Sequence, residues 1–138
     1  NLQQLAANNS NIIFHGKKPR DDMARYYKAS NFLIISLIDK PISAVTVPAK
    51  TQTYIAAKKP ILAIINGETA KIIRENNLGL CADPSNIHCI ASLFMKCIKM
   101  NQKEIKKFTC KNEYLTDTIF NREKTITKLL NLVLNGKI

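Results

Sequence analysis

Residues 60–68 read Pro60-Ile61-Leu62-Ala63-Ile64-Ile65-Asn66-Gly67-Glu68. The apolar run over 60–65 is typical of a strand that is buried on both faces of a parallel sheet. Asn66-Gly67 ends this strand with a turn signal, and Glu68 opens a helix whose Ile72 and Ile73 point inward. The stretch therefore predicts a strand that passes directly into a helix, which is the repeating unit of α/β folds.

The same alternation extends along the chain on both sides of this stretch. The pattern predicts strands over 11–15, 32–38, 60–65 and 79–82 and helices over 21–29, 48–57 and 68–77. Asp21 is the expected cap of the first helix, and Pro48 suits the first turn of the second. We expect the strand over 32–38 to be buried on both faces and residues 39–47 to form a loop. Four strands, each followed by a helix, predict an α/β fold with a Rossmann-like parallel sheet.

The pattern becomes entirely helical after residue 85. A helix over 86–100 is expected to turn inward its apolar residues Ile87, Ile90, Ala91, Phe94 and Ile98. Asn101 and Glu104 resemble a capping box that starts a second helix, and Asn121 is the expected cap of a third. The apolar residues of this third helix are Ile126, Leu129, Leu130, Leu132 and Val133. We expect these C-terminal helices to pack on the outside of the sheet.

The 138-residue chain is strongly basic, with 21 Lys and Arg against 10 Asp and Glu and a net charge of +11. Apolar residues make up 46% of the chain, which excludes a disordered protein, and no apolar run has the length of a membrane span. The charge is spread over the chain and few aromatic residues accompany it, so we expect no nucleic-acid partner. Two interpretations remain open for the lysines of residues 96–107: a solvated helix face, or a face that meets anionic lipid headgroups.

The four cysteines predict buried, reduced thiols. Cys81, Cys89, Cys97 and Cys110 form no Cys-x-x-Cys pair, and the two histidines lie far from any metal-ligand spacing. This pattern favours a cytosolic protein. The first residues carry no signal-peptide pattern and resemble the end of a helix from a longer chain.

Several segments, in this order, resemble a known enzyme family. They are residues 11–16 (Asn-Ile-Ile-Phe-His-Gly), 27–31 (Tyr-Lys-Ala-Ser-Asn), 48–61 (from Pro-Ala-Lys to Lys-Lys-Pro-Ile), Gly67-Glu68 and 78–80 (Leu-Gly-Leu). The series is similar to the C-terminal half of a family-four retaining glycosyltransferase with the GT-B fold. It most resembles bacterial fucosamine-type transferases of surface polysaccharide synthesis, and Phe120-Asn121-Arg122 resembles the closing segment of that family.

The resemblance implies a division of the chain and an activity. Residues 1–100 would form an incomplete Rossmann-like domain that binds a nucleotide-diphosphate sugar, and residues 101–138 a helical segment packed on it. The full-length enzyme would transfer the sugar to a lipid-linked acceptor held by an N-terminal domain, in the cytoplasm or at the inner face of the plasma membrane. The family needs no metal or other cofactor. The alternative is a non-catalytic nucleotide-binding module of Rossmann type.

The resemblance also assigns the donor contacts. The diphosphate would lie at the first turn of the helix that begins near Pro48, with Lys50 as a donor of charge. The complete set of expected nucleotide and diphosphate contacts is Gly16, Lys17, Lys18, Pro48, Ala49, Lys50, Thr51 and Thr53. The expected sugar contacts are Asp39, Val45 and Glu68.

The chain departs from the family at the positions where charge matters most. Two glutamates that the family places eight positions apart correspond to Val45 and Thr53, and a glycine of the family corresponds to Lys58. The pattern assigns no catalytic residue. The family's domain begins with two more strand–helix units, whose strands would be the central pair of the sheet. We therefore expect a free sheet edge, association into a homodimer or a strand-swapped pair, and no transferase activity of the chain alone.

Overall fold

The apolar stretch over residues 60–65 contains the central strand of the sheet. The computed structural model describes residues 2–6, 9–109 and 112–134. Within them, β1 (Leu33–Ser36), β2 (Ile61–Ile64) and β3 (Gly79–Ala82) form a parallel sheet in the order β1-β2-β3. Leu33 pairs with Ile61, and Ile61 pairs with Gly79. The α/β class and the parallel sheet are thus confirmed.

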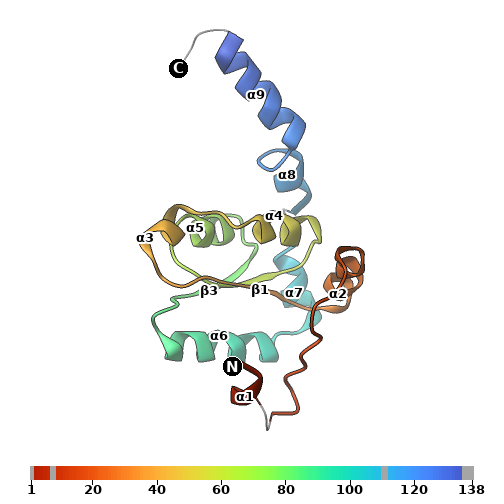
Figure 1. Cartoon of the computed structure of the whole chain (residues 1–138), viewed down its shortest axis with the longest axis vertical. Helices are drawn as coiled ribbons and strands as arrows, with labels where there is room; N and C mark the ends of the chain where they lie inside the picture. Colours follow the sequence, from red (N-terminus) through yellow and green to blue (C-terminus); the bar gives the residue numbers. More distant parts are fainter. Residues whose placement is uncertain (1, 7–8, 110–111, 135–138) are drawn as a thin grey trace.

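Helices cover the sheet on both faces. The helices α4 (Ala49–Ala56) and α5 (Glu68–Glu75) lie in the layer on one face, and α6 (Ile87–Lys99) lies on the other face (Figure 1). The short helix α3 (Pro41–Val45) precedes α4 in the first of these layers. Residues 39–47 were predicted to be a loop, and this prediction is wrong for 41–45. Pro41 at the first helical position pre-sets the backbone and sacrifices no hydrogen bond there.

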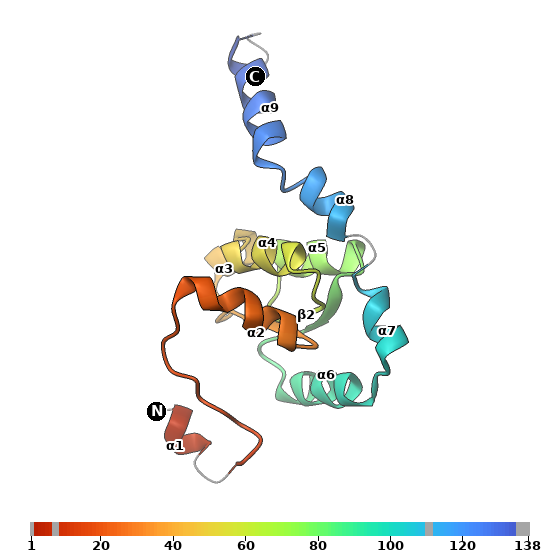
Figure 2. The same cartoon turned by 90° about the vertical axis from the view of Figure 1, so that its right-hand side faces the viewer.

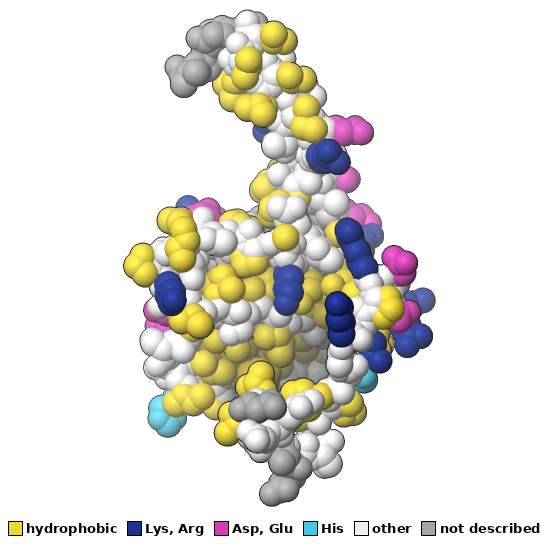
Figure 3. Space-filling model, in the orientation of Figure 1, with side chains coloured by type: hydrophobic (Ala, Val, Ile, Leu, Met, Phe, Trp, Pro, Cys, Tyr) yellow, Lys and Arg dark blue, Asp and Glu magenta, His cyan; other side chains and the backbone are white. Residues whose placement is uncertain are grey.

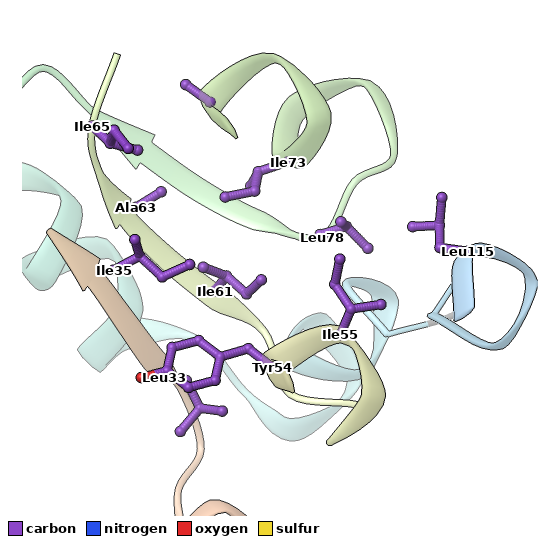
Figure 4. Packing of buried hydrophobic residues seen from close by; sticks show 11 residues of the cluster. Leu33, Ile35, Tyr54, Ile55, Ile61, Ala63, Ile65, Ile73, Leu78 and Leu115 are labelled. Atoms are coloured by element: carbon purple, nitrogen blue, oxygen red, sulfur yellow. The ribbon is translucent and has the colours of Figure 1, made fainter. Parts of the chain in front are cut away.

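The larger core lies between the sheet and the layer of α4 and α5 (Figure 4). Ile55, Ile61, Ile65, Ile73 and Leu78 are its largest fully buried apolar side chains beside Leu115. Full burial of one such side chain contributes about 1.5–3 kcal/mol, so this cluster is the main source of stability. A smaller cluster lies between the sheet and α6 and contains Leu62, Ala82, Leu93 and Cys97.

β1 is half exposed, which corrects the prediction that its stretch is buried on both faces. Leu33 and Ile35 face the larger core, whereas Ile34 is 46% exposed and Ser36 is also exposed. The reason is the position of α6, whose buried side chains pack on Leu62 of β2 and Ala82 of β3. β1 lies beyond β2 at the edge of the sheet, so α6 leaves the face of β1 that carries Ile34 uncovered.

Residues 11–15 form no strand, and this prediction is wrong. Ile12, Ile13 and Phe14 are 48%, 72% and 45% exposed in a segment without helix or strand. β-Branched and aromatic residues favour a strand only where a neighbouring strand completes the hydrogen-bond ladder, and this segment has no such neighbour. Figure 2 shows the segment leading from α2 (Met23–Ala29) towards α1 (Leu2–Leu5), away from the sheet.

The helix α2 begins differently from the prediction. A 3₁₀ turn, η1 (Arg20–Asp22), precedes it, and its N-cap is Asp22 without a side-chain cap bond, so Asp21 is not the cap. The other end of α2 is held firmly, because Lys59 Nζ donates to the carbonyl oxygens of Lys28 and Ser30 at 2.8 and 2.7 Å. Lys59 lies just before β2, so these bonds hold the end of α2 at the amino edge of the sheet.

The C-terminal helices follow the predicted caps, but only part of the predicted packing is found: α6 packs on the sheet, whereas α9 does not. Asn101 and Glu104 form the expected capping box of α7 (Gln102–Lys107), and Asn121 accepts a bond from the Lys124 amide at the start of α9 (Arg122–Leu134). A separate helix, α8 (Asn112–Asp117), lies between them and was not predicted. In α6 the buried residues are Leu93 and Cys97, so the inward face is rotated from the predicted one. α9 projects from the body with no buried residue (Figures 1 and 2).

Candidate functional site at the carboxyl edge of the sheet

The three strands end at one edge of the sheet, and their following loops meet there. Parallel sheets present ligand sites at this edge, where the loops open. Asn66 after β2 donates from Nδ2 to Asp83 Oδ1 after β3 at 3.2 Å. The backbone N–H and the hydroxyl of Ser85 donate to the same oxygen at 2.9 and 2.7 Å. These bonds lower the pKa of Asp83, and those from Ser85 have the largest effect.

A second set of contacts fixes the chain that leads into α4. Gly67 has φ 77°, and a Cβ built on it would lie 2.1 Å from the carbonyl oxygen of Ala44 in α3. Thr69 Oγ1, in the first turn of α5, donates to the carbonyl oxygen of Thr46 at 2.9 Å. The segment 44–46 is therefore held against the start of α5, which places the start of α4 beside the carboxyl end of β2.

The first turn of α4 is open to an anionic ligand. Its N-cap is Pro48, which makes no side-chain cap bond, and the turn contains no acidic residue. Ala49 and Lys50 are exposed there. A helix N-terminus carries a partial positive charge and free N–H groups, and Lys50 adds a full charge. At the neighbouring α5, by contrast, the carboxylate of Glu68 stands in the first turn.

The two threonines of α4 are placed differently. Thr51 is fully buried, and its Oγ1 has no hydrogen-bond partner within the part of the chain that is described. Thr53 is exposed and donates back to the carbonyl oxygen of Ala49 at 3.3 Å. Since residues four apart share a helix face, Thr53 lies on the same side of α4 as Ala49.

The expected sugar contacts all lie in segments of this edge. Asp39 follows β1 and is exposed, and Val45 ends α3 with 73% of its side chain exposed. Glu68 is exposed at the start of α5. The topology thus brings Asp39, Val45, the first turn of α4 and Glu68 to one edge.

The structure does not bring Gly16, Lys17 and Lys18 to this edge. Gly16 and Lys18 line a cavity of about 300 Å³ beside α2, together with Leu33, the first residue of β1. This cavity therefore lies towards the amino end of β1. The loop over residues 16–18 would lie at the carboxyl edge only if residues 11–15 formed a strand of the sheet, and they form none.

The cavity beside α2 has an aromatic lining that the sequence interpretation missed. The His15 and Tyr26 rings meet edge to face with centroids 5.3 Å apart, and the Arg25 guanidinium lies 5.4 Å from the Tyr26 ring centroid. Tyr27 also lines the cavity and packs edge to face on Tyr54 at 5.6 Å. The consecutive tyrosines of α2 were the only signal, and they are equally typical of a packed helix.

The thiols belong to no metal-binding group among the described residues. Burial raises the pKa of the Cys81 and Cys97 thiols, whereas Cys89 is exposed, which corrects the prediction of buried cysteines. These three thiols are free, and Cys110 lies outside the described residues. Over 2–6, 9–109 and 112–134, no group of three His, Cys, Asp or Glu side chains is arranged to hold a metal ion.

Comparisons with protein-family models, with curated proteins and with solved structures found no match to the chain. None of the described helices combines the length and the apolar character needed to cross a membrane.

Proposed function

We propose that the chain is the donor-binding part of a retaining glycosyltransferase and binds a nucleotide-diphosphate sugar at the first turn of α4. The observation that carries the proposal is the open start of this helix, with Pro48 as a cap without a side-chain bond, no carboxylate in the first turn, and Lys50 exposed. A diphosphate needs N–H donors and positive charge, and both are offered together there.

The strand order also supports the proposal. In a doubly wound sheet of order 3-2-1-4-5-6, the last three strands are neighbours in sequence order. The order β1-β2-β3 is what strands four, five and six of such a sheet would have. The resemblance to family-four glycosyltransferases implies the same three places, so the observed order is compatible with the proposal.

The proposed chemistry is stabilisation of the leaving diphosphate. Glycosyl transfer from a nucleotide sugar builds negative charge on the diphosphate as the glycosidic bond breaks. Fixed N–H dipoles at the start of α4 and the Lys50 ammonium would stabilise that charge. We assign no general acid or base to this chain, and the lipid-linked acceptor would be held by another domain of the full-length enzyme.

A non-catalytic nucleotide-binding module is the second candidate, and one observation favours it. By the resemblance, Val45 and Thr53 correspond to the two glutamates that contact the sugar and the ribose in the family, and the Thr53 hydroxyl donates to the carbonyl oxygen of Ala49. Without those carboxylates the site keeps its diphosphate contacts and loses charge-assisted contacts to the hydroxyl groups.

Calorimetric titration with a panel of nucleoside diphosphates and nucleotide sugars tests the proposal. We expect binding that weakens with added salt, and Lys50→Ala should weaken it about tenfold, since one charge-assisted contact is lost. Lys71→Ala, an exposed lysine of α5, is the matched control and should leave the affinity unchanged. Tighter binding of one nucleotide sugar than of its nucleoside diphosphate supports the transferase, whereas equal binding supports the module. Absence of binding by the whole panel would overturn both.

The proposed setting is the cytoplasmic face of a membrane that carries the acceptor. In α9, Ile126, Leu129, Leu130 and Val133 share one exposed helix face, and Lys124 and Lys128 lie on the other side. This distribution suits an anionic lipid surface. In flotation with vesicles, binding should require anionic lipid and should be lost in Leu129→Asp but not in Ile87→Asp, an equally exposed apolar residue of α6. Equal flotation of the two variants would exclude this contact.

A further inference from the structure

Among the described residues, the β1 edge of the sheet has no second partner strand. The amide groups of Leu33 and Leu37 donate to carbonyl oxygens of Pro60 and Ile64, so alternate residues of β1 face β2. By the alternation of a parallel ladder, the N–H and C=O groups of Ile34 and Ser36 point to the other side. Because β1 pairs only with β2 among the described strands, these groups form a free edge.

An apolar groove lies directly beside this free edge. Phe32, Ile34, Phe94 and Ile98 line a cavity of about 410 Å³ between β1 and α6. Phe94 and Ile98 are 36% and 76% exposed. In Figure 3, hydrophobic side chains gather across the middle of the molecule around a hollow between its two helical layers. Backbone groups for a ladder and an apolar surface for side chains are therefore present together, which are the two requirements for the addition of a strand.

The chain itself carries a segment that fits this edge. Residues 11–15 combine β-branched and aromatic residues, and Ile12, Ile13 and Phe14 are 48%, 72% and 45% exposed and belong to neither apolar core cluster. When extended, the segment places Ile12 and Phe14 on one face and Ile13 on the other. The segment and the free edge contain no charged residue, so their association would bury no charge.

The segment is not positioned to dock on its own β1. The His15 ring contacts Tyr26, and Gly16 and Lys18 line the cavity beside α2. From there residues 11–15 run away from the sheet (Figure 2). Docking on the same copy would break the contact between His15 and Tyr26, whereas docking on another copy does not require the segment to fold back across its own α2.

We propose that two copies of this chain pair by strand exchange, in which residues 11–15 of each copy add to the free edge of β1 of the other. Each copy offers one segment and one edge, so a two-fold pair satisfies both. The inference does not depend on the proposed ligand, and it concerns this 138-residue chain, in which β1 has only β2 as a neighbour among the described strands. It also has a distinctive salt dependence: each copy carries a net charge of +11, so added salt screens their repulsion and strengthens the pair.

Sedimentation equilibrium and amide hydrogen exchange on the full chain test this pairing. We expect a dimer that tightens with salt and protects the amides of Ile34 and Ser36. Ile13→Lys and Ile34→Lys should each weaken the dimer at least about tenfold, since a charge enters the joined strands. Ile87→Lys, which changes another exposed isoleucine, should leave the dimer intact, and circular dichroism checks that each variant is folded.

A mixing experiment separates strand exchange from other modes of association. The Ile13→Lys copy keeps an intact edge and the Ile34→Lys copy keeps an intact segment. A mixture of the two should therefore form a heterodimer with one intact junction, at concentrations where each variant alone stays monomeric. A monomer at all concentrations overturns the proposal. So does protection of the Ile34 amide in a monomer, which would show docking within one copy, or a dimer that survives Ile13→Lys and is lost in Leu129→Lys, which would place the interface on α9.

Discussion

The side-chain amide of Asn112 donates a 3.0 Å hydrogen bond to the main-chain oxygen of Ile55, which lies in the last turn of α4. Both residues are buried, at 1% exposure each. The Ile55 carbonyl also accepts the backbone amide of Lys58 at 2.9 Å, so Asn112 supplies its second hydrogen bond. Because Leu115 enters the same core from α8, Asn112 and Leu115 together attach α8 to the domain.

Asn112→Ala should lower the free energy of unfolding by about 1 kcal/mol, because a buried hydrogen bond is lost while the Ile55 carbonyl keeps its bond from the Lys58 amide. Urea unfolding, followed by circular dichroism, measures this as a lower midpoint. Asn131→Ala, at an exposed position of α9, is the control and should shift the midpoint very little. Equal midpoints for the two variants would mean that α8 is attached by apolar packing alone.

Lys58 lies just after α4 in the left-handed region, with φ 53°. A residue with a Cβ is disfavoured there, so Lys58→Gly should be more stable than Lys58→Ala by about 1 kcal/mol. Both variants lose the ion pair between Lys58 and Glu113, so their difference isolates the backbone. Thermal unfolding of the pair gives the measurement. If the alanine variant is the more stable one, the left-handed geometry does not limit stability here.

Acid should destabilise the domain partly through Asp83. Its pKa is lowered in the folded chain by hydrogen bonds from Ser85 and Asn66, so protons bind the unfolded chain more readily. The resulting stability is complete above the ordinary pKa of an aspartate and is lost as the pH falls through the lowered value. In Asp83→Asn the free energy of unfolding should therefore fall less steeply on acidification. Asp39→Asn serves as the control at the same edge, and the two profiles should differ only in the acid range.

The helices and strands that the sequence predicted correctly are those whose partners lie close in the chain. The stretch over 60–82 was predicted within a few residues, because β2, α5 and β3 pack on one another. The strand over 11–15 was predicted wrongly, because its pattern is strong but a strand exists only beside another strand. Ile34 was predicted to be buried because its apolar run cannot reveal that β1 lies at an edge.

In the candidate site, too, some residues were placed correctly from the sequence and others were not. The order of the predicted elements was enough to place Pro48, Lys50 and Glu68 at one edge, since a helix that follows a parallel strand begins there. Lys18 was expected at the same edge because it would follow a strand over 11–15, and that strand does not form. The burial of Thr51 depended on which side of α4 meets the sheet, and three threonine and glutamine positions in a row give no periodicity to decide that.

Introducing a carboxylate at Thr53 should strengthen the proposed nucleotide binding. Thr53 is exposed on the same side of α4 as Ala49, one turn from the proposed diphosphate contacts. A glutamate there would accept hydrogen bonds from the ribose hydroxyls, and Thr53→Glu should raise the affinity for a nucleoside diphosphate about tenfold.

Two controls make this last prediction specific. Gln52→Glu adds the same charge at the neighbouring exposed position, on a different side of the helix, and should give no gain. A 2′,3′-dideoxy nucleoside diphosphate lacks the hydroxyl groups, so its affinity should not rise in Thr53→Glu and should fall slightly, since the new carboxylate repels the phosphates. Calorimetry on the two ligands decides the matter. An equal gain for both would mean that the carboxylate acts elsewhere than on the ribose, and a loss for both would place the diphosphate too close to Thr53 for the proposed site.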